Sequence, residues 1–120
     1  MELKMKRIYE SPEETDGFRI LVDRLWPRGV KKEAAQLDAW LKYSAPSPDL
    51  RKWFAHDPDK FAAFKERYEE ELLTNPPTAA AVAEILKQLT ETDVTLVYAA
   101  RDPEINHVVV LRDFVESQRK

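Results

Sequence analysis

Residues 94–103 have the sequence VTLVYAARDP, and this stretch decides the fold. It starts with β-branched residues, stays apolar apart from Thr95 and the Tyr98 hydroxyl, and stops at Asp102-Pro103. This pattern predicts a strand from Val94 to Ala100. The next apolar run, residues 107–111, has strand propensity, but the Asp-Pro start and the polar end of the chain favour a helix with Asp102 as its cap.

Two more strands are predicted near the N-terminus, from Lys4 to Tyr9 and from Phe18 to Asp23. The polar segment 11–17 separates them, and its Pro and Gly stop regular structure. The second strand is almost continuously apolar, which is typical of a strand covered on both faces.

The remaining chain predicts helices with an apolar stripe at spacings of three and four. They extend over Lys32 to Lys42, over a short segment capped by Ser47 with Pro48 at its first position, from Asp57-Pro58 to Asn75-Pro76-Pro77, and from about Thr78 to Thr90. The order β-β-α-α-α-α-β-α predicts a small single-domain α/β fold over residues 1–120. We expect a mostly parallel three- or four-stranded sheet with helices packed around it.

The composition and net charge of the chain argue against several classes of function. The chain of 120 residues has a formal net charge of −3, which argues against a general nucleic-acid binder. It has no Cys and two His, so we expect no thiolate chemistry, no metal site and no cofactor. Two glycines cannot form a glycine-rich phosphate loop. The N-terminal segment resembles neither a signal peptide nor a membrane span, so a cytoplasmic protein without membrane contact is the default expectation.

The first candidate site follows the second predicted strand, in the sequence DRLWPRG of residues 23–29. Guanidinium groups of Arg24 and Arg28 suit oxyanions, with Asp23 beside them. The alternative is an exposed loop in which Asp23 pairs with one arginine. Trp26 is expected in the core, although an indole at this position could also stack on a ligand.

The second candidate site follows the strand from Val94 to Ala100. Tyr98, Arg101, Asn106 and His107 surround a predicted helix start, where backbone N–H groups attract anions. His107 could act as a general base, since the helix N-terminus disfavours its charged form. The alternatives are a solvated Arg101 and a His107 that only packs or forms a hydrogen bond.

A third candidate is His56, the other histidine available for proton transfer. It precedes Asp57, but adjacent residues rarely form a catalytic pair, so we expect Asp57 to cap a helix. The acidic residues 66–71 are interpreted as a solvated helix face.

Four segments carry a resemblance to a known family: residues 7–9, 17–29, 50–58, and 96–102 followed by Asn106-His107. The block Val-Asp-Arg-Leu-Trp-Pro-Arg-Gly of residues 22–29 is its most specific part. The chain resembles the YeaO-like branch of domain-of-unknown-function family number 488. This resemblance implies no established activity. More distant members carry Cys-His-Arg near residues 105–107, and the Cys is missing here.

Three hypotheses follow. In the first, the loops at the carboxyl edge of the sheet form an Arg- and His-lined pocket for a phosphorylated or nucleotide-like anion. In the second, the chain is a non-catalytic regulatory or interaction module whose basic loop contacts nucleic acid or a protein partner. In the third, the arginines only pin loops through ion pairs. The sequence leaves open whether the protein is an enzyme and what its oligomeric state is.

Overall fold

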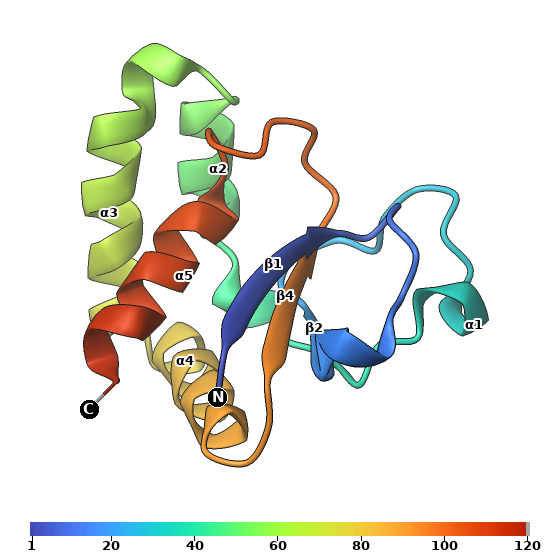
Figure 1. Cartoon of the computed structure of the whole chain (residues 1–120). Coiled ribbons are helices and arrows are strands. Elements are labelled where there is room, and N and C mark those ends of the chain that lie inside the picture. Colours follow the sequence, from blue (N-terminus) through green and yellow to red (C-terminus); the bar gives the residue numbers. More distant parts are fainter. Residues whose placement is uncertain (120) are drawn as a thin grey trace.

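Strand β4 (Val94–Tyr98) lies in the interior of a four-stranded sheet in the computed structural model, which describes residues 1–119 (Figure 1). The strand order is β1-β4-β2-β3, with β1 at Leu3–Arg7, β2 at Phe18–Leu21 and β3 at Ala39–Trp40. All three pairings are parallel. The predicted α/β class with a parallel sheet is therefore confirmed.

The two faces of β4 enter two separate cores, because successive side chains of a strand point to opposite faces. Val94, Leu96 and Tyr98 belong to the larger core beneath the helices. Val97 packs with Ile8 in a smaller core on the opposite face. Burial on both faces explains why this strand is almost wholly apolar.

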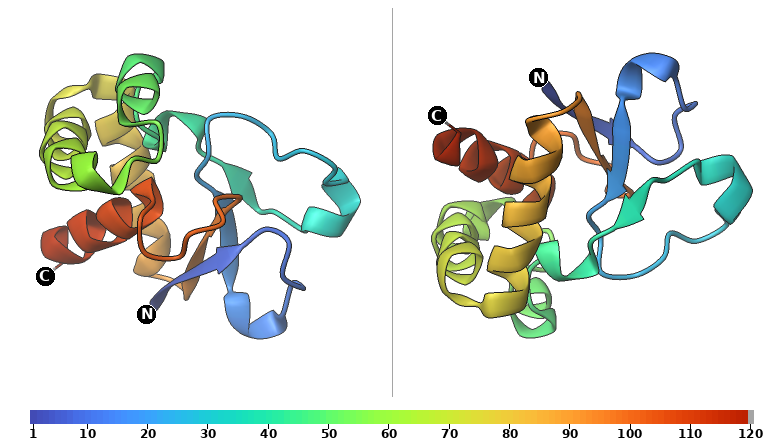
Figure 2. Two further views of the ribbon diagram at one scale, coloured as in Figure 1. Left: turned by 90° about the horizontal axis from the view of Figure 1, so that it is seen from above. Right: turned by 90° about the horizontal axis from the view of Figure 1, so that it is seen from below.

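Four helices cover the face with the larger core (Figure 2): α2 (Pro48–Phe54), α3 (Phe61–Thr74), α4 (Pro76–Leu89) and α5 (His107–Gln118). Short 3₁₀ turns occupy Glu14–Asp16, Lys42–Ser44 and Pro58–Lys60. As predicted, Ser47 caps α2: its hydroxyl accepts the Leu50 N–H at 3.2 Å, and Pro48 occupies the first turn.

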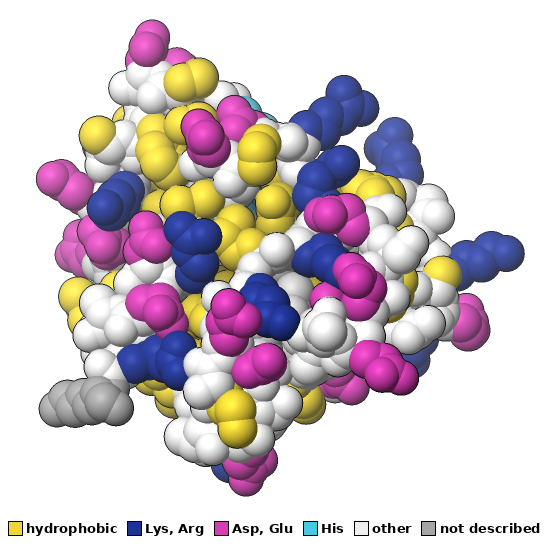
Figure 3. Space-filling view, viewed as in Figure 1, with side chains coloured by type: hydrophobic (Ala, Val, Ile, Leu, Met, Phe, Trp, Pro, Cys, Tyr) yellow, Lys and Arg dark blue, Asp and Glu magenta, His cyan; other side chains and the backbone are white. Residues whose placement is uncertain are grey.

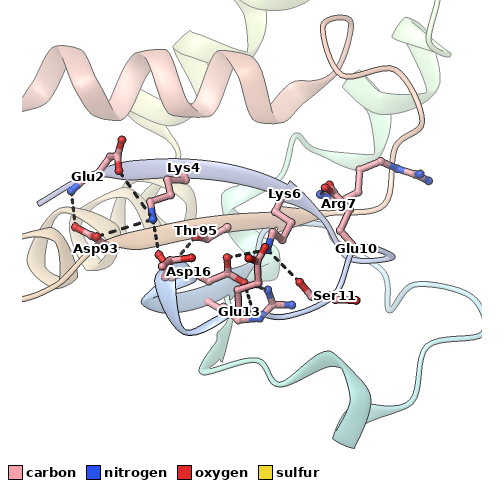
Figure 4. A network of polar contacts seen from close by, with 12 residues as sticks. Glu2, Lys4, Lys6, Arg7, Glu10, Ser11, Glu13, Asp16, Asp93 and Thr95 are labelled. Carbon is pink, nitrogen blue, oxygen red and sulfur yellow. Dashed lines mark hydrogen bonds and ion pairs between the residues drawn. The ribbon is translucent and has the colours of Figure 1, made fainter.

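The opposite face is covered by irregular chain and by the short helix α1 (Lys32–Ala35). Beside it lies a network of polar contacts with the buried residues Asp16 and Arg19 at its centre (Figure 4). The Asp16 carboxylate accepts hydrogen bonds from Arg19 Nη1 at 2.6 Å and from Lys6 Nζ at 2.8 Å. The same arginine donates to the Ala35 carbonyl, at 2.9 Å from Nη2, and so holds α1 against β2.

The predicted helix from Lys32 to Lys42 is wrong beyond Ala35. Gln36 adopts a left-handed backbone with φ 48°, and the chain then runs as β3 along the edge of the sheet. Leu41 N–H donates to the Leu21 carbonyl at 2.9 Å. Pairing with β2 satisfies the backbone groups that a helix would have satisfied internally.

The expected cap of the last helix is also wrong. Asp102 accepts the N–H groups of Glu104 and Ile105 at 2.8 and 3.0 Å and so closes a turn before the helix. Asn106 is the N-cap of α5, with its side-chain oxygen 3.0 Å from the Val109 nitrogen. Because the turn adds residues, α5 begins at His107 rather than directly after Asp102.

The other boundaries differ by small amounts from the prediction. The three predicted strands end earlier, at Arg7, Leu21 and Tyr98, and α4 begins at Pro76 rather than Thr78. None of the helices within residues 1–119 is long and apolar enough to cross a membrane.

Candidate functional site

A cavity of about 540 Å³ opens where β2 and β4 end, between the loops that follow them and the chain before and after α2. Carboxyl ends of neighbouring parallel strands share one edge of the sheet, and open α/β sheets bind ligands there. Six of the predicted site residues line this cavity: Asp23, Arg24, Trp26, His56, Arg101 and His107. The structure thus brings together side chains from three candidate segments.

Asp23 joins the two strand ends. Its Oδ2 accepts the Ala99 N–H at 2.9 Å, and its Oδ1 lies 3.6 Å from His107 Nε2. Burial raises the pKa of the Asp23 carboxyl, although the His107 ring and the Ala99 N–H oppose this rise. The contacts of the Asp23 carboxylate therefore hold the two strand ends together at the cavity.

The His107 imidazole is held in place by a hydrogen bond to the Val22 carbonyl. Nε2 lies 3.0 Å from the Val22 carbonyl oxygen, and a carbonyl can only accept, so Nε2 carries a proton. Burial lowers the pKa of His107, and the nearby Asp23 charge offsets part of that effect. We therefore assign a neutral ring with its proton on Nε2 at neutral pH.

Arg24 has both a structural and an electrostatic role. Its Nε donates to the Pro46 carbonyl at 3.2 Å and its Nη2 to the Ala45 carbonyl at 3.3 Å. These bonds hold the loop before α2 against the loop after β2. A guanidinium has five N–H donors, so others remain for a ligand.

Arg51 lines the same cavity, although no sequence pattern singles it out as a site residue. It lies inside α2, where an exposed arginine is ordinary, and only the packing of α2 against the strand ends brings it to the site. His56 arrives there through a tight turn, since Ala55 and His56 both have left-handed backbones with φ 46° and 57°. Asp57 does not orient His56: its Oδ1 caps the following turn at Asp59 N–H, 3.0 Å away, as expected.

Three predicted residues lie elsewhere or serve other contacts. Arg28 is not among the cavity residues, and its carbonyl accepts the Tyr9 hydroxyl at 3.1 Å. Tyr98 is 4% exposed, because strand alternation turns it toward the helices. Asn106 is buried as the cap of α5 and lines a small adjoining pocket of about 40 Å³.

Trp26 was expected in the core, and this expectation is wrong. The side chain is 36% exposed and forms part of the cavity wall. Its Nε1 donates to the Val30 carbonyl at 2.8 Å, and its ring meets Trp40 edge to face at a centroid distance of 5.5 Å. The loop around Pro27 therefore presents the indole outward.

Positively charged side chains outnumber negatively charged ones in the lining of the cavity. Three guanidinium groups (Arg24, Arg51 and Arg101) line it against the two carboxylates of Asp23 and Asp102. Two backbone N–H groups lower the pKa of Asp102, so it is ionised at neutral pH. Lys and Arg side chains also gather over the loops at this end of the sheet, at the upper right of Figure 3. Within residues 1–119, no group of three or more His, Cys, Asp or Glu side chains could hold a metal ion.

Comparisons with known proteins concern the family. The family model described as "Inactive DUF488-N3 subclade" matches residues 2–120. The "Uncharacterized protein YeaO" of Escherichia coli (strain K12) is 42% identical over 117 residues, which cover 98% of this chain and 99% of the relative. The "Uncharacterized protein Rv3073c" of Mycobacterium tuberculosis (strain ATCC 25618 / H37Rv) is 38% identical over 116 residues, 97% of this chain and 95% of the relative.

No solved structure matches the chain. The resemblance stated from the sequence is confirmed by the family model and by relatives of nearly equal length. The chain belongs to domain-of-unknown-function family 488, in its inactive N3 subclade.

Proposed function

We propose that this protein binds a small phosphorylated or nucleotide-like anion in the cavity at the carboxyl edge of its sheet, and that it does so without chemical turnover. The observation that carries the proposal is the convergence of Arg24, Arg51 and Arg101 on one concavity. Guanidinium groups on a convex ridge would instead favour a flat partner surface. A concave site gives a ligand several donors at once and removes it from water.

The size of the cavity supports the same ligand class. About 540 Å³ falls within the range of pockets that hold small molecules, roughly 300 to 1,000 Å³. Trp26 provides an aromatic wall beside the arginines, which suits a base or sugar ring attached to a phosphate. Such a ligand would contact side chains, since the chain has no glycine-rich loop.

The polar groups nearest the strand ends favour binding over catalysis. His107 Nε2 is engaged by the Val22 carbonyl, and Asp23 Oδ2 by the Ala99 N–H. Asn106 is committed to capping α5. None of these groups is paired with a nucleophile in the way that acyl- or phosphoryl-transfer sites require. The description of the subclade as inactive supports this interpretation.

Isothermal titration calorimetry with inorganic pyrophosphate, AMP and ribose 5-phosphate at low salt tests the proposal. We expect at least one of them to bind, and we expect Arg51→Ala and Arg101→Ala each to weaken binding roughly tenfold or more. A hydrogen bond to a charged group contributes about 1.5 to 3 kcal/mol. Both residues are exposed, so neither substitution should disturb the core.

Lys65→Ala is the matched control, because it removes one positive charge from an exposed position on α3, outside the cavity. It should leave anion affinity unchanged. The proposal fails if none of the three anions binds, or if the two arginine variants and the Lys65 variant bind equally well.

A further inference from the structure

Three exposed aromatic side chains lie at or beside the cavity. Trp26 at the cavity wall is 36% exposed, Trp40 on β3 is 40% exposed, and Tyr43 just beyond is 50% exposed. Trp26 and Trp40 touch edge to face. Large aromatic rings exposed together on a small domain usually mark a binding surface.

The two indoles are fixed by their only polar atoms. Trp26 Nε1 donates to the Val30 carbonyl at 2.8 Å, and Trp40 Nε1 donates to the Asp23 carbonyl at 2.7 Å. With both N–H groups engaged, the exposed parts of the rings can offer a partner only apolar and π contacts. The rings are therefore oriented in advance for stacking, which lowers the entropic cost of binding.

Two cations lie against these rings, and one of them, Lys42, lies near both Trp40 and Tyr43. Lys42 Nζ is 5.7 Å from the centroid of the Trp40 ring and 5.6 Å from that of Tyr43. Arg24 Cζ lies 5.6 Å from the Tyr43 centroid and belongs to the cavity as well. We call Trp26, Trp40, Lys42 and Tyr43 the aromatic ladder. It joins the cavity at Trp26 and, through Arg24, at Tyr43.

From these exposed rings and the cations beside them we infer that the aromatic ladder binds single-stranded nucleic acid. Bases stack on the rings, because every base has a π face, and phosphates lie beside Lys42 and Arg24. The bound nucleic acid would place the phosphate of one nucleotide in the cavity. This last part rests on the proposed function, whereas stacking along the ladder does not.

A polyanion fits the ladder better than an uncharged partner does. A proline-rich peptide or a second copy of the chain would also cover aromatic rings, but neither needs a cation beside them. The formal net charge of −3 does not exclude a polyanion here, since it is a sum over the whole chain and four of the 22 acidic residues lie together on α3, at Glu66 and residues 69–71.

Fluorescence anisotropy with a labelled oligothymidylate of about 12 nucleotides at low salt tests the inference. We expect the affinity to fall as the salt concentration rises. The slope of log affinity against log salt concentration should be about −0.7 for each phosphate contacted. Trp40→Ala and Lys42→Ala should each lower the affinity, the tryptophan variant by about fivefold or more. Lys65→Ala, with the same charge change as Lys42→Ala, should not.

Three results would overturn the inference: no binding at low salt, equal affinity of the ladder variants and the Lys65 variant, or a dimer in solution that Trp40→Ala or Lys42→Ala dissociates. Lys42 is exposed, so its variant keeps the test valid even if Trp40→Ala unfolds. The three anions of the calorimetric test distinguish the two proposals. Failure of all three to bind together with ladder-dependent oligonucleotide binding refutes the cavity proposal alone, and the reverse result refutes the ladder alone.

Discussion

Asp23 shows how one residue can couple the strand ends. Its carboxylate receives the Ala99 N–H from β4's following loop and approaches His107 at the start of α5. Its backbone carbonyl receives the Trp40 indole N–H. The end of β4, the start of α5 and the aromatic ladder therefore meet at a single residue.

His107 gives a prediction about pH. Burial lowers its folded-state pKa, so the unfolded chain binds more protons in the acid range. The stability that comes from keeping the ring neutral is complete above the unfolded pKa, about 6.5, and declines as pH falls below it. His107→Gln keeps an N–H donor for the Val22 carbonyl but cannot titrate.

We therefore expect the free energy of unfolding of the wild type to fall more steeply than that of His107→Gln between about pH 7 and about pH 5. Urea denaturation at both pH values measures it. Asp23 has a raised pKa, which acts in the opposite direction at lower pH. The His107 ring opposes this rise, so its loss strengthens the Asp23 effect in the variant and adds to the difference between the two proteins. Parallel pH profiles would contradict the assignment of a buried neutral ring.

At the scale of elements, Gly17 sets the start of β2. Its φ is 65°, and an added Cβ would lie 2.2 Å from the Asp93 carbonyl oxygen, which also accepts the Phe18 N–H at 2.8 Å. Gly17→Ala must move this backbone and weaken the junction between β2 and β4. We expect a loss of about 2 kcal/mol or more in the free energy of unfolding.

Gly29→Ala is the control for that substitution. Gly29 also has a positive φ, 77°, but an added Cβ has nothing within 4 Å. Only the left-handed backbone penalty of about 1 kcal/mol applies there. Equal losses in the two variants, measured by urea denaturation, would mean that the contact with Asp93 does not limit the site.

Elements whose determinants are local could be predicted from the sequence. Ser47-Pro48 specifies the start of α2, Asn75-Pro76 the end of α3, and the apolar run at residue 94 specifies β4. The failure at residues 36–42 has a non-local cause. The apolar spacing there suits a helix, but pairing with β2 has no signature within the segment.

The candidate site also has a part that could be predicted from the sequence and a part that could not. The carboxyl-edge rule placed Arg24 and Arg101 together, because strand direction and order suffice for that. Arg51 depends on how α2 packs, and the exposure of Trp26 depends on the bond of its indole to Val30. Neither interaction could be found in a periodicity or a motif.

At the scale of the whole molecule, one buried ion network ties the N-terminal strand to the rest of the sheet. Asp16 is 4% exposed and binds Lys6 of β1 and Arg19 of β2, and its backbone carbonyl accepts the Thr95 hydroxyl of β4 at 2.7 Å. Burial raises the pKa of Asp16, but the hydrogen bonds from Lys6, Glu13 N–H and Arg19 outweigh it and lower the pKa overall.

Removing the negative charge of Asp16 should lower the free energy of unfolding substantially. Asp16→Asn keeps the shape but removes the charge partner of the buried Arg19 and one of the two carboxylates that Lys6 contacts, and breaking a buried pair costs about 3 to 5 kcal/mol. That is a large part of the roughly 5 to 15 kcal/mol that stabilises an ordinary domain. Glu116→Gln, at an exposed pair with Arg119, is the control and should have little effect.

The pH dependence gives the decisive check. Since the folded-state pKa of Asp16 is lowered, its contribution is complete above the unfolded pKa and is lost as pH falls through the folded value. The difference in unfolding free energy between the wild type and Asp16→Asn should therefore be largest near about pH 7 and should shrink toward about pH 3. A difference that stays constant over this range would mean that shape, rather than the ionised carboxylate, holds β1 and β2 together.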